Sequence, residues 1–250
     1  MNNGRDFFDR KYQAELHLEA EWMRRTAGQK VRSVSSLLRS VRAHPESLLE
    51  IGCGTGAVIG ECQRRGLAQR FIAVDYSNTA LEYLRANSSG ITVLQADITS
   101  SDFRFETPVD AAVCSHVIEH LEEPGVFLDA LHQRIDFAHV IFEVPLEDLP
   151  GHRFRHRGAD RLQNPSGHVQ FFTAASFEAL LQRHGFRILG RRRYVPILER
   201  ETIRFQADRH GLSRTARWLK TLTHHTLPTL SAPLWSRLYY AHYAVVCSKA

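Results

Sequence analysis

Side chains that can bind a metal ion or carry a proton stand close together at residues 116–120. His116, Glu119 and His120 are spaced i, i+3 and i+4, so on a helix all three share one face. The string HVIEH also matches H-x-x-E-H, a pattern with which zinc proteases hold their metal. Imidazole nitrogens and carboxylate oxygens bind divalent metals and move protons, so this cluster is a candidate site for either chemistry.

A glycine-rich loop follows the apolar run SLLEI and indicates a ligand of another kind. The loop GCGTG at residues 52–56 allows a tight turn and brings backbone N–H groups close to a ligand at the start of the next helix. With Ala57 it satisfies G-x-G-x-x-G/A, and Asp75 lies where the ribose-binding acid of a nicotinamide dehydrogenase is expected. Glu50, two positions before the loop, would repel a pyrophosphate but could meet an ammonium group. A ligand with a free amino group therefore fits this loop better than a dinucleotide.

These groups need a scaffold, and the hydrophobic pattern predicts alternating strands and helices. Short apolar runs that are separated by helical patterns indicate parallel βαβ units, and their continuous apolar character is typical of buried strands. The first five runs are at residues 47–51, 71–74, 91–95, 110–115 and 139–144. A helical pattern covers residues 5–43, and residues 145–172 are irregular.

The rest of the chain adds helices and two more strands. A helix begins after its N-cap Thr173 and ends at Gly185. FRILGRRRYVP and HYAVVCS predict strands, with mostly helical residues at 197–240 between them. The fold class is therefore α/β, with a doubly wound, seven-stranded, mostly parallel sheet. Ligands of such sheets bind beyond the carboxyl ends of the strands.

Five segments in this order resemble the class I S-adenosylmethionine-dependent methyltransferases. They are EIGCGTG, AVDYS, QADI, CSHVIEHLEEP and HVQFFTAASFEALLQRHGF, and the resemblance covers about residues 40–196. It implies a Rossmann-like core at residues 45–196, with an acceptor-side insertion at 145–172. N-terminal helices at 1–44 and a basic helical cap with the last strand at 197–250 would flank this core.

The resemblance also implies which residues would hold S-adenosylmethionine. Glu50 and the glycine loop would surround its amino-acid part, and Asp75 would accept hydrogen bonds from both ribose hydroxyls. Tyr76, Asp97 and Ile98 would lie around the adenine, and Ser115 would lie under the sulfonium. The complete implied set is Glu50, Gly52, Cys53, Gly54, Gly56, Asp75, Tyr76, Asp97, Ile98 and Ser115. As alternatives to ligand binding, Asp75 could cap a helix and Asp97 could shape a turn.

Two methyltransferase groups carry E-x-x-E-H as divalent-metal ligands where this chain has HVIEH. They are the ubiquinone-biosynthesis O-methyltransferases and the small-RNA 2′-O-methyltransferases, and the RNA group adds a downstream histidine that corresponds to His168. The resemblance thus implies a metal site of His116, Glu119, His120 and His168, in which His116 replaces a glutamate. Three histidines would shift the preference from Mg²⁺ toward Mn²⁺, Fe²⁺ or Zn²⁺. The alternative is that Glu119 and His120 only cap and pack a short helix, and the neighbouring methyl-donor site disfavours a protease.

The histidines and the uneven charge bear on the acceptor. A hydroxyl acceptor needs a base or a metal, so the many histidines favour O-methylation, with His168 as ligand or base and His152 and His156 behind it. Residues 1–150 hold 15 basic and 22 acidic side chains, whereas residues 151–250 hold 17 and 5. The second part should attract anions. We expect a small or carbohydrate-like anionic acceptor, with RNA as the alternative and a non-catalytic binding protein of this fold as the third hypothesis.

Composition excludes several other classes of protein. The 250 residues are 43% hydrophobic and 24% charged, which indicates a globular chain and not a disordered one. The four cysteines form no C-x-x-C pair, which excludes a disulfide scaffold or a cysteine-rich zinc module and fits a reducing cytosol. No apolar run approaches the roughly 18 residues that span a bilayer, and the N-terminus lacks a secretory apolar region. We therefore expect a cytoplasmic protein without a membrane span, of unspecified oligomeric state.

Overall fold

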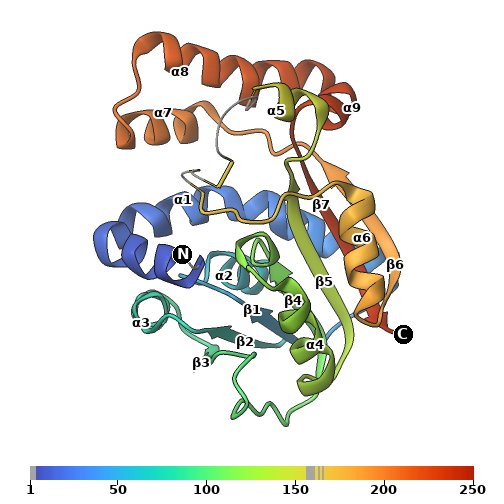
Figure 1. The fold of residues 1–250 in the computed structure, drawn as a ribbon. Coiled ribbons are helices and arrows are strands. Elements are labelled where there is room, and N and C mark those ends of the chain that lie inside the picture. Colours follow the sequence, from blue (N-terminus) through green and yellow to red (C-terminus); the bar gives the residue numbers. More distant parts are fainter. Residues whose placement is uncertain (1–3, 156–160, 163, 165) are drawn as a thin grey trace.

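Seven strands form one sheet in the order β3-β2-β1-β4-β5-β7-β6 (Figure 1). The computed structural model describes residues 4–155, 161–162, 164 and 166–250. The strands are β1 (Ser47–Ile51), β2 (Arg70–Asp75), β3 (Ile91–Gln95), β4 (Val109–Ser115), β5 (Phe137–Leu146), β6 (Phe186–Tyr194) and β7 (Ala241–Lys249). The first five strands pair in parallel, and β7 runs antiparallel to both β5 and β6. The predicted seven-stranded, mostly parallel sheet is confirmed.

Helices cover both faces of this sheet (Figure 1). They are α1 (Gly4–Ser40), α2 (Ala57–Arg64), α3 (Asn78–Asn87), the short η1 (Ile118–His120), α4 (Pro124–Arg134), α5 (Pro150–Arg155), α6 (Ala174–Arg183), α7 (Arg200–Arg209), α8 (Arg214–Thr221), the π-helical η2 (Leu222–Thr226) and α9 (Leu227–Leu238). Helix α1 is interrupted at Glu15, where φ is −143°, and packs with α2 and α3 against one face. Helices α4 and α6 pack against the other face.

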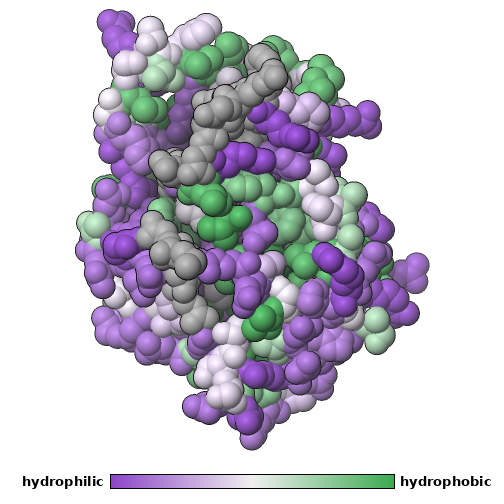
Figure 2. All heavy atoms as spheres, in the orientation of Figure 1, coloured by the Kyte–Doolittle hydropathy of each residue, from purple (hydrophilic) through white to green (hydrophobic). Residues whose placement is uncertain are grey.

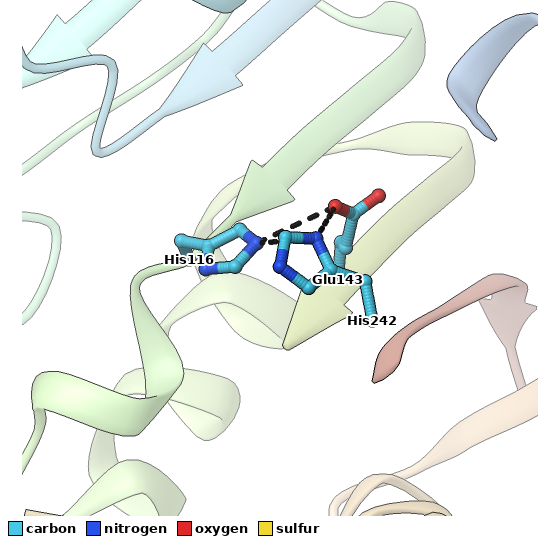
Figure 3. A group of neighbouring side chains, drawn as sticks. All are labelled: His116, Glu143 and His242. Atoms are coloured by element: carbon cyan, nitrogen blue, oxygen red, sulfur yellow. Dashed lines mark hydrogen bonds and ion pairs between the residues drawn. The ribbon is translucent and has the colours of Figure 1, made fainter. Parts of the chain in front are cut away.

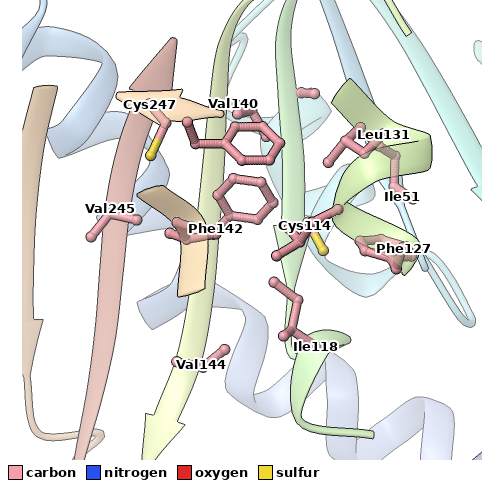
Figure 4. Close-up of a cluster of buried hydrophobic side chains, with 14 of the residues drawn as sticks. Ile51, Cys114, Ile118, Phe127, Leu131, Val140, Phe142, Val144, Val245 and Cys247 are labelled. Carbon is pink, nitrogen blue, oxygen red and sulfur yellow. The ribbon is translucent and has the colours of Figure 1, made fainter. Parts of the chain in front are cut away.

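Each face of the sheet has its own apolar core. Figure 4 shows part of the larger one, in which Phe142 of β5 and Cys114 of β4 pack with Leu131 of α4. In the second core, buried residues of α1 such as Val31 and Val34 pack with residues of β1, α2 and α3. Complete burial of an aliphatic or aromatic side chain contributes about 1.5–3 kcal/mol. The two cores therefore fix the strands whose carboxyl ends carry the functional residues.

A cap of helices lies over one end of the sheet (Figure 1). It consists of α5, α7, α8, η2 and α9, and it contacts α1, β6 and β7. The face in Figure 2 is mostly hydrophilic, with hydrophobic side chains gathered in its middle, between the cap and the sheet. In the part of the chain that the structure describes, no helix is long and apolar enough to cross a membrane.

Of two local predictions, one was wrong and the other is confirmed. The strand at residues 91–95 exists, but it is the edge strand β3 and Leu94 is 37% exposed, so its prediction as a buried strand was wrong. The helix predicted after Thr173 is confirmed as α6, where the Thr173 hydroxyl accepts a hydrogen bond from the Ser176 N–H at 3.1 Å. Gly185 follows it in the left-handed region, with φ of 79°. A lone apolar run thus identified a strand but not its position in the sheet.

Candidate active site

The first of two adjoining cavities lies at the carboxyl ends of β1, β2 and β4. Its volume is about 170 Å³, and Phe8, Tyr12 and Met23 of α1 contribute to its wall. Nine of the ten residues that the sequence assigned to the cofactor line this cavity: Glu50, Gly52, Cys53, Gly54, Asp75, Tyr76, Asp97, Ile98 and Ser115. The ends of four strands, β1 to β4, and the loops that follow them thus bring these residues to one place.

Close packing requires two of the glycines in the loop. Gly52 has a φ of 71°, and a Cβ atom there would lie 2.4 Å from Cγ2 of Val117. Gly56 has a φ of 79°, and a Cβ atom there would lie 2.3 Å from Cδ1 of Leu84 on α3. Gly56 is the remaining member of the expected cofactor set, and it does not line the cavity. Its contact instead lets α2 begin directly against α3.

Asp75 organises the loop from the end of β2. Its Oδ2 accepts a hydrogen bond from the Gly54 N–H at 2.7 Å, and its Oδ1 accepts one from the Ser77 N–H at 2.9 Å. The carboxylate is only 6% exposed, and the helix cap of α3 is Ser77 rather than Asp75. Asp97 binds the Thr99 N–H and hydroxyl through one oxygen, as a turn residue does, and also lines the cavity.

Glu50 and Ser115 are buried polar groups of the cavity wall. One Glu50 oxygen accepts a hydrogen bond from the Ile59 N–H at 2.8 Å, and burial raises the pKa of this carboxyl to about 8. A nearby cation would favour its ionised form. The Ser115 hydroxyl is buried and has no hydrogen-bond partner among the described residues. Such an unsatisfied group in a cavity wall is suited to a polar ligand.

Three of the four expected metal ligands form one group. Donor atoms of Glu119, His120 and His168 all lie within 4.8 Å of one another. The Nδ1 atom of His120 lies 3.1 Å from the Gly167 carbonyl, and the Nδ1 atom of His168 lies 2.7 Å from a Glu147 oxygen. Both rings therefore leave Nε2 free, as metal-binding histidines do. The rings lie 4.9 Å apart, although His168 is remote in the sequence.

The carboxylate of Glu119 is completely buried in this group. Neither oxygen has a hydrogen-bond partner among the described residues, although Nδ1 of His116 lies 2.9 Å from Oε1 in ion-pair contact. Burial alone would raise the pKa of Glu119, but the charges of His116, His120 and His168 outweigh it and lower the pKa to about 2. Burial lowers the pKa of His120 to about 4, while Glu147 raises that of His168 against the effect of its own burial.

His116, the fourth expected ligand, turns its other ring nitrogen to a second group. Its Nε2 atom lies 3.2 Å from Nδ1 of His242 and 3.4 Å from Oε1 of Glu143 (Figure 3). Glu143 and His242 are both at least nine-tenths buried, and sequence reasoning did not assign either one. The available signal was an acid inside the apolar run HVIFEV and a histidine at the start of HYAVVCS. Neither feature of the sequence indicates that Glu143 and His242 contact each other.

The second cavity, of about 550 Å³, lies beside the first. His116, His120, Lys30, Phe8 and Met23 line both cavities, so the two meet at the histidines. Most of its wall comes from α1, α7, β6, η2 and the segment before β7. The expected insertion at 145–172 contributes Ser166 and His168. Of its other predicted histidines, the side chain of His152 and all of His156 lie outside the described residues.

Comparison with known proteins identifies the family. A family model described as a methyltransferase domain matches residues 20–190, which is more than half of the chain. The chain belongs to this methyltransferase family, and the predicted resemblance to the class I S-adenosylmethionine-dependent enzymes is confirmed.

Individual relatives agree with this assignment. A ubiquinone biosynthesis O-methyltransferase of Pseudomonas syringae is 27% identical over 36% of this chain and 40% of its own length. A probable S-adenosylmethionine-dependent methyltransferase of Mycobacterium tuberculosis is 31% identical over 46% of this chain and 38% of its own length. The chain thus matches less than half the length of either relative. A Thermotoga maritima structure, described as a possible histamine N-methyltransferase, shares the fold with a TM-score of 0.60, 15% identity and coverage of 96% and 97% of the two chains.

Proposed function

We propose that this protein transfers the methyl group of S-adenosylmethionine to a hydroxyl oxygen of a small anionic acceptor. The observation that carries the proposal is the junction of the two cavities, which His116 and His120 both line. A methyl donor in the smaller cavity and an acceptor in the larger one would meet beside these rings. The enzyme's main contribution would be to hold the two reacting atoms ~3 Å apart and in line, away from water.

The cofactor would occupy the smaller cavity. Glu50 would bind its ammonium group, Asp75 its ribose hydroxyls, and the unsatisfied Ser115 hydroxyl would face the sulfonium region. Tyr76, Asp97 and Ile98 would surround the adenine. Asp75 already accepts two backbone N–H groups, so its remaining lone pairs are what the ribose would use. Gly56 would act indirectly, through the packing of α2.

Deprotonation of the acceptor would take place at the histidine cluster. His168 receives its orientation from Glu147 at 2.7 Å, and its free Nε2 is the candidate base or metal donor. The donor set of Glu119, His120 and His168 fits a divalent metal, because the buried Glu119 carboxylate has the ion-pair contact with His116 but no hydrogen-bond partner at its second oxygen, and both rings present Nε2. Such a metal, when bound, would lower the pKa of the acceptor hydroxyl.

The wall of the larger cavity favours an anionic, partly aromatic or sugar-like acceptor. Lys11 and Arg209 line it but are paired with Glu19, whereas Lys30 has no ion pair among the described residues. Trp22, Tyr194 and Tyr240 add flat surfaces. A volume of about 550 Å³ is in the range of small-molecule sites.

RNA is the second candidate acceptor. It is favoured by the excess of basic side chains in residues 151–250 and by the proximity of His168 to Glu119 and His120. An RNA acceptor would have to present a ribose hydroxyl to the same histidines. The compact larger cavity favours the small molecule.

The experiment is methyl transfer from S-adenosylmethionine with a labelled methyl group. The protein is incubated with separated small-molecule and RNA fractions of a cell extract, with and without a chelator, and the products are analysed by mass spectrometry. We expect label on oxygen in the small-molecule fraction. Label only in RNA would establish the alternative, and label only on nitrogen, or no transfer to either fraction, would contradict the proposal. Full transfer in the presence of the chelator would leave His168 as a base and remove the metal.

We also place the protein in the cytoplasm. All four cysteines, Cys53, Cys62, Cys114 and Cys247, are buried and unpaired. Free thiols fit a reducing compartment. Fractionation of cells that express the tagged protein would test this placement.

A further inference from the structure

Donor atoms of one half-buried residue, His116, and two buried ones, Glu143 and His242, converge from three different strands or their ends. His116 directly follows β4, Glu143 lies in β5, and His242 lies in β7, which runs antiparallel to β5 (Figure 3). Nδ1 of His242 is 3.1 Å from Oε1 of Glu143, and Nε2 of His116 is 3.2 Å and 3.4 Å from these two atoms. The three atoms therefore form a nearly equilateral triangle.

These distances match the edge of a tetrahedral metal site. Atoms that lie ~2.0–2.1 Å from a tetrahedral zinc ion are about 3.3 Å from one another. A hydrogen-bonded triad would instead have contacts of ~2.7–3.2 Å, and a proton between each pair that interacts. Two sides of the triangle, 3.1 Å and 3.2 Å, also lie within that range, but the third, 3.4 Å, exceeds it, and each of the three atoms is close to both others.

The second ring nitrogens are also arranged as around a metal. Nδ1 of His116 faces the carboxylate of Glu119 at 2.9 Å, and Nε2 of His242 lies 3.1 Å from the Tyr240 hydroxyl. Metal-binding histidines commonly use their other nitrogen in this way, which fixes the ring and its tautomer. The Tyr194 hydroxyl donates to Oε1 of Glu143 at 2.7 Å and so helps to fix the carboxylate.

The backbone of His116 provides an independent observation. Its φ of 59° lies in the left-handed region, which residues other than glycine rarely adopt. Such a conformation tends to occur at functional sites. It directs the ring of His116 between Glu119 and the pair of Glu143 and His242.

We propose that His116, Glu143 and His242 form a second metal site, separate from the group of Glu119, His120 and His168, which takes a divalent transition metal such as zinc. The ligands are Nε2 of His116, Oε1 of Glu143 and Nδ1 of His242. His116 and His242 line the larger cavity, so the open fourth position faces the acceptor space. A site with three protein ligands and one open position is typical of a metal that binds a substrate atom or water.

Zinc titration can separate the two groups. The His168→Gln variant disables the group that contains Glu119 and His120, so the zinc that this variant still binds reports on the second site. Apo-protein of this variant is titrated with zinc chloride in a calorimeter. A further Glu143→Gln or His242→Gln substitution is expected to weaken the remaining zinc affinity by at least ~100-fold. His224→Gln, a histidine of the same cavity outside the triangle, is the matched control and should leave the affinity unchanged.

A zinc affinity that is the same with and without Glu143→Gln and His242→Gln would overturn the proposal, as would absence of zinc from the His168→Gln variant. Either result would mean that the triangle holds only protons. Because buried substitutions can impair folding, wild-type crystals soaked in zinc provide a second measurement. An anomalous peak is expected ~2.0–2.2 Å from the three named atoms. A zinc ion that is found only beside Glu119, or no peak at all, would also overturn the proposal.

Discussion

The cofactor cavity and the histidine cluster adjoin, yet they are built in opposite ways. The smaller cavity, proposed to hold the cofactor, draws Glu50, the glycine loop and Asp75 from a continuous β1–α2–β2 unit, and α1 completes its wall. The histidine cluster consists of side chains from the loop after β4, from β5 and β7, and from residue 168. The first site is a property of a local motif, and the second is a property of the sheet topology.

The same contrast holds for charge. The smaller cavity is lined by Glu50, Asp75 and Asp97, which suit a cofactor that carries a sulfonium and an ammonium group. The larger cavity is lined by Lys11, Arg209 and Lys220, of which the first two are paired with Glu19 in the same wall. Among the described residues, Lys30 is the one lysine that lines both cavities, and burial lowers the pKa of its amine. The walls of the two cavities thus differ in the balance of their charges.

The sharpest way to separate the two sites is His168→Gln. We expect turnover at saturating cofactor to fall at least ~100-fold, because the base or metal donor is removed, while cofactor affinity stays within about twofold. Turnover is measured by labelled methyl transfer, and affinity by calorimetry with S-adenosylhomocysteine. His184→Gln is the control, since His184 also contacts a carboxylate through Nδ1, that of Asp129, but lies outside both cavities. Loss of cofactor affinity in His168→Gln would mean that the sites are not independent.

The reverse effect is expected for Asp75→Asn. Its cofactor affinity should fall about 10- to 100-fold, because a charge-assisted hydrogen bond contributes about 1.5–3 kcal/mol, while turnover at saturation changes little. The matched control is Asp110→Asn. Asp110 also accepts backbone N–H groups, those of Glu46 and Ser47, but at the far end of β1. An Asp75→Asn variant that folds and binds cofactor normally would remove Asp75 from the ribose site.

The smallest effect is expected for Glu50→Gln, and it has two parts of opposite sign. Burial raises the pKa of Glu50 from 4.5 to about 8, so its favourable contribution to folding is fully present below pH 4.5 and is lost as the pH rises to 8. Glutamine cannot ionise, so above pH 8 the variant should melt a few degrees higher than the wild type, with no gain near pH 5.

Cofactor affinity of the same variant should fall about tenfold, because the ammonium group loses a carboxylate partner. Melting curves from pH 5 to 9 and calorimetry at pH 8 would check both parts. Equal melting temperatures at all pH values would show that Glu50 is not protonated in the folded protein. Unchanged affinity would show that it does not bind the ammonium group.

The sequence predicted the sheet, and it predicted that most of the residues lining the smaller cavity lie together, because both depend on local patterns. The loop GCGTG and Asp75 each follow a strand of their own βαβ unit, so spacing along the chain translates directly into position. The family resemblance also predicted that His168 lies close to His120. Glu143 and His242 could not be found in this way. Their proximity depends on the pairing of β5 with β7, and an antiparallel partner from the end of the chain has no fixed spacing.

The position of β7 between β5 and β6 has a consequence for how the protein folds. His116 and His242 are separated by 126 residues in the sequence, and Glu143 and His242 by 99. The triangle therefore forms only when contacts between residues far apart in the sequence have been made. Contacts of such sequence separation form slowly, whereas β1, α2 and β2 can assemble from neighbouring residues. On a ribosome or in refolding, the glycine loop and Asp75 would therefore take up their positions before the triangle of His116, Glu143 and His242 closes. The triangle is complete only in a molecule whose last strand, β7, has paired with β5.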